Sequence, residues 1–288
     1  MVIFLQAVAN GLLLGGVYGL VSVGLTLIFG VMRIVNFAHG EFLMLGMFAA
    51  YWLARLFDLN PYLVVLPAGL LLFLAGVLTQ RLLIDRVLGQ TDEAQILLTV
   101  GLSAFLQGGA LFVWGADYRT VVTPLATASL ALGSVFLSIP RLIAFGVAML
   151  LAAGLYLLLT QTDLGKAMRA AAENREVAVL LGIDTRGIFL IAFGIGTALV
   201  GVAGALMVPV LATFPTVGTL FTLTAFVVVV LGGAGDIVGA MIGGGIIGVT
   251  EALIATYVAL DLAPVATFLI FLLILLVRPQ GLFGTGRV

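Results

Sequence analysis

The sequence predicts an all-α protein, a polytopic bundle of eight or nine transmembrane helices. Hydrophobic residues make up 63% of the 288 residues and charged residues only 9%, whereas about 25% are charged in an ordinary soluble domain. The few charges are separated by apolar runs of the length that a membrane helix requires, about 20 residues. The 37 glycines fit the same class, because small residues allow membrane helices to approach closely.

The charge-free runs place the spans of the first half in order. The first span is expected over about 6–30. The next run, Phe42–Ala54, has only 13 residues and is marginal for crossing a bilayer alone. Three full spans are then expected at Pro61–Gln80, Ala94–Ala116 and Leu142–Thr162.

The second half of the chain predicts four more spans. Residues Gly187–Gly235 carry no charge over 49 positions and are interrupted by Pro209 and Pro215. This length predicts two spans joined by a turn near the prolines. The last two spans are expected at about Ile237–Tyr257 and Leu262–Val277. The total is eight full spans and one doubtful span, which gives eight or nine.

The basic residues predict the orientation. If the loop at 163–186 is cytoplasmic and nine spans are traced from it, nine basic residues lie inside and three outside. This distribution agrees with the positive-inside rule and places the N-terminus outside and the C-terminus inside. The inner residues are Arg33, Arg81, Arg86, Lys166, Arg169, Arg175, Arg186, Arg278 and Arg287, and the outer ones are Arg55, Arg119 and Arg141. The longest outer loop, about 117–140, is expected to be an exposed connection.

Composition excludes several classes of function. A net charge of −1 provides no basic field for nucleic acid. The chain has no cysteine and a single histidine, His39, which excludes thiolate or histidine metal sites and histidine catalytic networks. The N-terminus lacks the basic stretch of a cleavable signal peptide. We therefore expect a retained first span, membrane lipid as the surroundings, no bound metal or cofactor and no enzyme chemistry.

The loop at 163–186 holds eight of the 25 charges. Thr162 or Asp163 can cap a helix start, Gly182 can end that helix, and Asp184 can cap the next one. One face is apolar and the charged residues fall elsewhere, which predicts one short amphipathic helix on the cytoplasmic surface. The alternative is a solvated connector, but the loop is longer than a helical hairpin needs and alternates in sign as docking surfaces do. The apolar face comprises Leu164, Met168, Ala171, Ala178 and Leu181.

Polar residues also interrupt the apolar segment VMRIVNFAHGEF, residues 31–42. Ionisable residues at membrane depth are costly and usually face a water-filled path or a partner. Asn36, His39 and Glu41 are therefore candidates for lining or gating a path. The alternative is a tight turn at the cytoplasmic membrane edge, with Arg33 only as a topology signal. His39 and Glu41 are two positions apart and would not share a face of a regular helix.

Glycines recur at helical spacing near both ends of the chain. In LGGAGDIVGAMIGGGIIG, residues 231–248, they superficially look like a dinucleotide-binding loop, but no βαβ unit surrounds them. Their spacing suits close helix packing instead. The predicted packing residues are Gly11, Gly15, Gly19, Gly235, Gly239 and Gly243.

Three segments together carry a family resemblance. They are GLTLIFGVMRIVNFAHGEFLMLG, GKAMRAAAENREVAVLLGID and LGGAGDIVGAMIGGGIIGVTEAL. In sequence, order and spacing they resemble the hallmark segments of bacterial branched-chain amino-acid ABC transporter permeases, and more narrowly the first of the two permease subunits. The resemblance implies a single permease domain over residues 1–288 in the inner membrane.

The resemblance also implies partners and a mechanism. Residues 163–186 would be the coupling loop that docks on a cytoplasmic ATPase. A second, different permease, two ATPases that bind ATP and Mg, and a periplasmic substrate-binding protein would complete the importer. The chain has no glycine-lysine phosphate loop, so ATP hydrolysis must occur on a partner. Candidate ATPase contacts are Lys166, Arg169, Glu173, Asn174, Arg175, Glu176 and Asp184.

The implied substrates are branched-chain, aliphatic amino acids. Importers of the same family for urea, short amides or other amino acids are an alternative. A secondary transporter driven by an ion gradient is a further alternative, although the chain has no convincing inverted repeat and few charges in its later spans.

Overall fold

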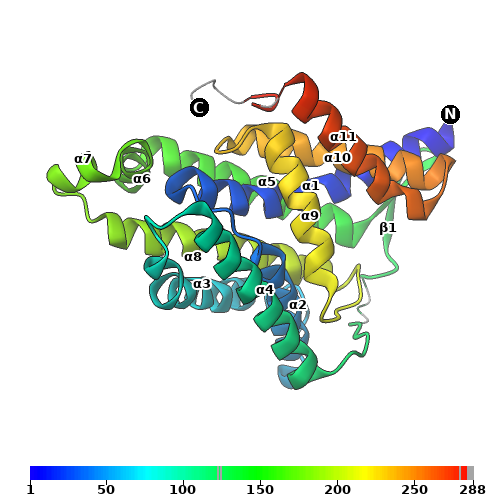
Figure 1. Ribbon diagram of the computed structural model, residues 1–288. Helices are drawn as coiled ribbons and strands as arrows, with labels where there is room; N and C mark the ends of the chain where they lie inside the picture. Colours follow the sequence, from blue (N-terminus) through cyan, green and yellow to red (C-terminus); the bar gives the residue numbers. More distant parts are fainter. Residues whose placement is uncertain (122, 124, 279, 284–288) are drawn as a thin grey trace.

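The computed structural model describes residues 1–283 apart from 122, 124 and 279, so the predicted inner residue Arg287 lies outside the described part. It confirms an all-α bundle with one small hairpin (Figure 1). The α-helices are α1 Val2–Met32, α2 His39–Phe57, α3 Val65–Leu82, α4 Asp92–Trp114, α5 Ile139–Gln161, α6 Asp163–Glu173, α7 Arg175–Leu180, α8 Thr185–Met207, α9 Val217–Gly232, α10 Ile237–Tyr257 and α11 Ala263–Val277. The short 3₁₀ helices are η1 Ile84–Arg86 and η2 Leu260–Leu262, and the strands are β1 Ser129–Leu132 and β2 Val135–Ser138.

Within the described part, eight helices are long and apolar enough to cross a membrane. The doubtful span at 42–54 is one of them, because α2 starts at His39 and reaches 19 residues. The short helix is α9 instead, with 16 residues. The two helices predicted across 187–235 are present and are joined by a turn at residues 208–216, near the prolines as expected, but the second helix is shorter than the expected span of about 20 residues. At about 1.5 Å per residue, α9 is roughly 24 Å long against a hydrocarbon core of about 30 Å.

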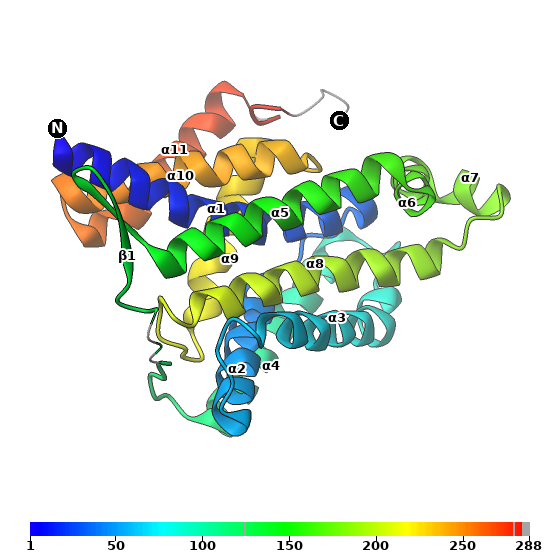
Figure 2. The same ribbon diagram turned by 180° about the vertical axis from the view of Figure 1, so that it is seen from behind.

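Helix α1 is the centre of the bundle. It packs against α10, α8, α5 and α9, and both views show α1 running beside α5 and α10 (Figures 1 and 2). In its most apolar stretch 78% of the residues are buried, against 17% for α4 and for the η2–α11 span. The outer helices therefore present their apolar side chains to the surroundings, as expected for helices in contact with lipid.

Glycines allow the α1–α10 contact. A Cβ atom added at Gly11 would lie 2.6 Å from the carbonyl oxygen of Gly248, and one at Gly15 would lie 2.6 Å from that of Gly244. Ordinary contacts of a Cβ begin at about 3.4 Å, so the two backbones approach more closely than any side chain permits.

The other predicted packing glycines also lie at helix contacts, with one exception. Gly19 faces Met241 of α10, while Gly239 and Gly243 face Gly232 and Val228 of α9. Gly235 is not on a helix: it lies in the turn before α10, with a φ of +93°. A positive φ of this size favours glycine, because glycine has no Cβ atom to clash with the backbone.

The two ends of the bundle differ in structure. The helices α6 and α7 lie at one end, and the N-terminus and the β1–β2 hairpin lie at the other (Figure 2). The hairpin is tied to α1 by two hydrogen bonds: Gln6 Nε2 donates to the Phe136 carbonyl at 2.7 Å, and the Phe136 N–H donates to Gln6 Oε1 at 2.8 Å. The described residues of the loop 117–140 are mostly exposed or half-buried, as expected, but part of the loop forms a hairpin that is attached to α1.

Candidate functional site

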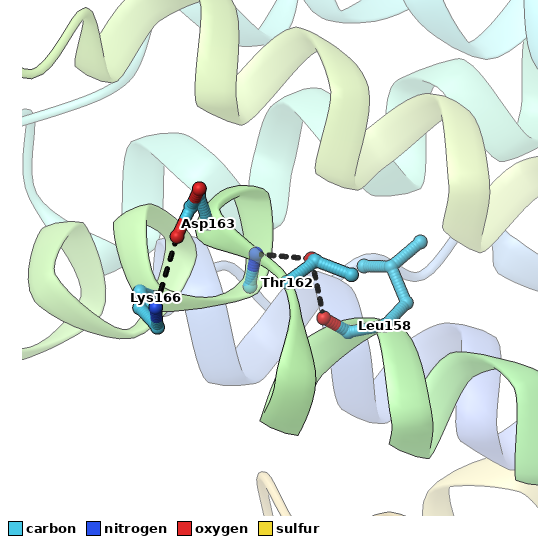
Figure 3. Close-up of polar contacts among 5 residues, drawn as sticks. Leu158, Thr162, Asp163 and Lys166 are labelled. Atoms are coloured by element: carbon cyan, nitrogen blue, oxygen red, sulfur yellow. Dashed lines mark hydrogen bonds and ion pairs between the residues drawn. The ribbon is translucent and has the colours of Figure 1, made fainter.

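The charged segment after α5 starts at a rigid joint (Figure 3). Thr162 Oγ1 donates to the Leu158 carbonyl at 2.6 Å and accepts the Gly165 N–H at 3.1 Å, which caps α6. Lys166 Nζ lies 2.9 Å from Asp163 Oδ1, and this ion pair lowers the pKa of the Asp163 carboxyl. An oxygen cap and an acidic first turn both stabilise a helix N-terminus. The joint thus links α5 directly to α6.

Gly165 makes this joint tight. A Cβ at this position would lie 2.5 Å from the Leu159 Cα and would overlap the Leu158 carbonyl oxygen. The first turn of α6 therefore presses against the last turn of α5. No flexible side chain separates the two backbones at this point.

The segment contains two helices rather than the single one expected. The chain breaks at Asn174, which has an extended backbone (φ −152°, ψ 107°), and its side chain accepts the Val177 N–H at 3.1 Å to cap α7. Asn174 is therefore engaged in capping. Asp184 has the same kind of role, since its side chain accepts the Gly187 N–H at 3.1 Å at the start of α8.

One face of α6–α7 packs into the hydrophobic core. Met168, Ala171 and Ala178 are buried, as the predicted apolar face requires, and Leu164 is half-buried. Leu181 departs from the prediction and is 73% exposed. The break at Asn174 accounts for this difference, because it changes the direction of the chain before Leu181.

Two side-chain contacts hold the second half of the segment to the bundle. The Arg175 guanidinium lies over the Phe189 ring of α8, 5.3 Å from its centroid. Arg186 Nε lies 2.8 Å from Asp85 Oδ2, and Gln80 Nε2 donates to the other oxygen of Asp85 at 3.1 Å. The segment is therefore connected to α3 and η1 as well as to α5 and α8.

The outer face of the segment is exposed and mixed in character. The charged side chains of Lys166, Arg169, Glu173, Arg175 and Glu176 are all exposed. Helix α7 adds an exposed apolar patch, which the charge pattern of the sequence did not predict. It consists of Val177, Val179, Leu180 and Leu181, with Leu180 85% exposed. A clustered apolar patch with a charged rim is typical of a protein–protein contact.

Asn36, His39 and Glu41 lie together at the junction of α1 and α2, and each is at most 1% exposed. They contact different helices, as their spacing predicted. His39 Nε2 donates to the Val21 carbonyl of α1 at 2.9 Å. Glu41 Oε1 accepts a hydrogen bond from Ser103 Oγ of α4 at 3.3 Å. Their interior position differs from that of Arg33, which is exposed at the end of α1.

Each of these three side chains also has a polar atom without a partner in the described part of the chain. The atoms are Asn36 Nδ2, His39 Nδ1 and Glu41 Oε2. A buried polar atom left unpaired costs about 1–3 kcal/mol, so each of these atoms is a candidate for contact with water or a ligand. The described residues include no group of three or more metal-ligating side chains.

Comparisons with known proteins agree with these features. The model of the family described as "Branched-chain amino acid transport system / permease component" matches residues 7–278. The high-affinity branched-chain amino acid transport permease proteins BraD of Pseudomonas aeruginosa and LivH of Escherichia coli are each 31% identical to the chain, over 99% of it and 97% of their own length. A probable LivH protein of Methanocaldococcus jannaschii is 33% identical over 92% of this chain and 88% of its own. No solved structure gives a significant match.

Proposed function

Because this chain belongs to the family of branched-chain amino acid transport permease components, we propose that it imports branched-chain, aliphatic amino acids as the first of two permease subunits. It is a multi-pass membrane protein and a permease rather than an enzyme. The observation that carries the proposal is the combination of a full-length family match with a single charged segment packed against one end of the bundle. The whole chain, residues 1–288, serves as one permease domain.

ATP hydrolysis takes place on partner subunits. The chain has no glycine-lysine phosphate loop, so two cytoplasmic ATPases bind ATP and Mg. A second permease, different from this chain, forms the other half of the path, and a periplasmic binding protein delivers the amino acid. The named relatives are permease proteins of branched-chain amino acid transport systems, which supports a chain that works together with further subunits.

The segment α6–α7 is the contact with the ATPase. The apolar patch Val177, Val179, Leu180 and Leu181 supplies the centre of that contact, and the surrounding charges select the partner. Asn174 and Asp184 act as positioning residues, because their side chains cap α7 and α8. The surrounding charged residues are Lys166, Arg169, Glu173, Arg175 and Glu176.

Closure of the ATPase pair moves this segment as a unit. The capped start at Thr162 and the close contact at Gly165 transmit the movement to α5, and the Arg186–Asp85 ion pair at the start of α8 transmits it to η1. The helices then tilt between an outward-open and an inward-open arrangement. Rigid joints suit this task because a flexible loop would absorb the displacement.

The orientation places α6–α7 in the cytoplasm of a bacterial cell, with the chain in the inner membrane. The excess of basic residues on that side supports it. The N-terminus is then outside and the C-terminus inside. The position of the N-terminus at the end of the bundle opposite α6 is consistent with this arrangement (Figure 1).

Asn36, His39 and Glu41 line or gate the translocation path. Their burial together with their three unpartnered atoms supports this role. Alanine at all three positions is expected to abolish uptake while the importer still assembles. Uptake at the wild-type rate in the assembled triple variant would remove these residues from the path.

The proposal is tested with the complete importer in proteoliposomes that contain ATP. Uptake of labelled leucine should require hydrolysable ATP and should persist when ionophores collapse the ion gradients. Unlabelled isoleucine and valine should compete, and urea or acetamide should not. Uptake that ionophores abolish and ATP does not support would show a gradient-driven transporter, and competition by urea or acetamide alone would assign a different substrate.

A further inference from the structure

A second candidate site lies where α2 ends and the chain turns toward α3. A cavity of about 540 Å³ is formed there by the end of α2, the α2–α3 turn and the α4–α5 connection. This volume falls in the usual range of small-molecule sites, about 300–1,000 Å³. Under the proposed orientation the cavity opens to the outside. Its lining includes Ala54, Arg55, Asp58, Leu59, Val121 and Thr123.

The walls of the cavity combine apolar side chains with polar ones. Ala54 and Tyr51 are each 5% exposed, and Val121 and the more exposed Leu59 also contribute apolar surface. Thr123 is also 5% exposed, and its Oγ1 has no hydrogen-bond partner in the described part of the chain. A buried hydroxyl without a partner on a cavity wall indicates that a polar ligand or water completes it.

Opposite charges stand at the rim of the cavity. Arg55 Nη1 donates to the Tyr51 hydroxyl at 2.6 Å, which fixes the guanidinium beside the opening. Asp58 ends α2 in a left-handed conformation with a φ of +51°, and its carboxylate makes no hydrogen bond or ion pair with any described residue. Arg55 and Asp58 do not pair with each other, so both charges can bind a ligand.

Arg119, which is next to the cavity residues Tyr51 and Thr120, adds positive charge. Its guanidinium lies 5.8 Å from the centroid of the Tyr51 ring and 5.4 Å from that of Trp52, and its Nη2 donates to the Trp114 carbonyl at 2.6 Å. The Arg119 backbone is held by hydrogen bonds to Thr213 at 2.9 and 2.7 Å. The positive potential near Arg55 is therefore built into the fold.

We propose that this cavity is an outer binding site for the free amino acid, an aliphatic zwitterion. The ligand carboxylate binds Arg55, its ammonium group binds Asp58, and its side chain contacts Ala54, Leu59 and Val121. Charge-assisted hydrogen bonds of both signs select a zwitterion over a neutral or singly charged molecule. The inference rests on the proposed function and deepens it by placing the substrate before it enters the path.

The position of the cavity on α2 gives this site a direct connection to the path. Helix α2 carries the cavity at its last turn and His39 and Glu41 in its first turn. Nineteen residues of α-helix span about 28 Å. An amino acid released from the cavity therefore follows one helix from the outer surface to the buried polar junction.

The test is binding of tritiated leucine to the complete importer in nanodiscs, without ATP and without binding protein. Saturable binding is expected, with competition by isoleucine but not by leucinamide, which lacks the carboxylate, or 4-methylpentanoate, which lacks the ammonium group. Arg55→Gln and Asp58→Asn should each weaken leucine binding about tenfold or more, the usual effect of losing one hydrogen bond to a charged group. Thr120→Trp should block the opening and leave every charge in place.

Two substitutions serve as matched controls. Arg141→Gln and Asp261→Asn remove the same charges from positions outside the cavity lining, and both should bind leucine as the wild type does. If all three cavity variants bind leucine normally, or if the wild type binds none, the site is wrong. Weaker capture of the binding protein with unchanged leucine binding would assign the cavity to a protein contact and also overturn the inference.

The proposed function is judged separately in the same preparation, by ATP-driven leucine uptake in the presence of the binding protein. Uptake with a normal apparent KM in Arg55→Gln and Asp58→Asn would overturn the cavity site and leave the importer function intact. Absence of uptake in the wild type would overturn the importer function itself.

Discussion

The glycine contact between α1 and α10 makes a quantitative prediction about Gly244→Ala. The new Cβ would overlap the Gly19 backbone nitrogen and would lie 2.6 Å from the Gly15 carbonyl oxygen, and an ordinary contact needs 3.4 Å, so the helices must separate by at least about 0.8 Å. Overpacking of this kind costs about 1–3 kcal/mol, and the higher helix propensity of alanine returns up to about 1 kcal/mol. We expect a net loss of about 1–2 kcal/mol and a Tm lower by roughly 2–8 °C.

The assay is thermal unfolding of the purified chain in one detergent, followed by circular dichroism, with the neighbouring residue as control. Gly245 lies on the same turn of α10, and a Cβ there would meet only Leu12 Cδ1 at an ordinary 3.7 Å. Gly245→Ala should therefore unfold at or slightly above the wild-type temperature. Equal Tm values for the two variants, or a Gly244→Ala protein as stable as the wild type, would refute the packing argument.

Three further predictions concern the α6–α7 segment. Gly165→Ala should reduce leucine uptake more than ATP hydrolysis, because its Cβ would lie 2.5 Å from the Leu159 Cα and would push α6 away from α5. Gly154→Ala is the control: the space around that position is open, so neither rate should change. Leu180→Ser should weaken copurification of the ATPase about tenfold or more, because the substitution removes an exposed apolar side chain from the centre of the proposed contact with the ATPase. The hydrogen bond and ion pair with Lys166 lower the pKa of Asp163, so the contribution of this carboxylate to the start of α6 is present above the ordinary carboxyl pKa and is lost as the pH falls. The protection factors of the first amides of α6, which compare each exchange rate with its intrinsic rate at the same pH, should therefore fall on acidification in the wild type and not in Asp163→Asn.

The gaps between charges predict most of the helices because a charge inside lipid is costly. The same rule misplaces the start of α2. His39 and Glu41 lie inside that helix, and their burial depends on contacts with α1 and α4 that no local pattern reveals. It also overestimates α9, because a run without charges does not show where an apolar turn ends.

The charged segment was predictable as a unit, but its internal geometry was not. An alanine-rich sequence favours one continuous helix, whereas the Asn174 side chain caps a second one. The exposed apolar patch on α7 follows from that break. The β1–β2 hairpin was missed for a related reason, since Gln6 stabilises it from 130 residues away.

The central claim is that an ATPase drives this permease through α6–α7. The most direct measurement records leucine uptake and ATP hydrolysis together in proteoliposomes for the wild type and for the double charge reversal Arg169→Glu with Glu173→Arg. The account predicts one of two defects in the reversed variant: the ATPase no longer binds, or it binds and hydrolyses ATP without driving transport. Leucine uptake falls to background with either defect. Assembly and uptake at the wild-type level in the reversed variant would contradict the account.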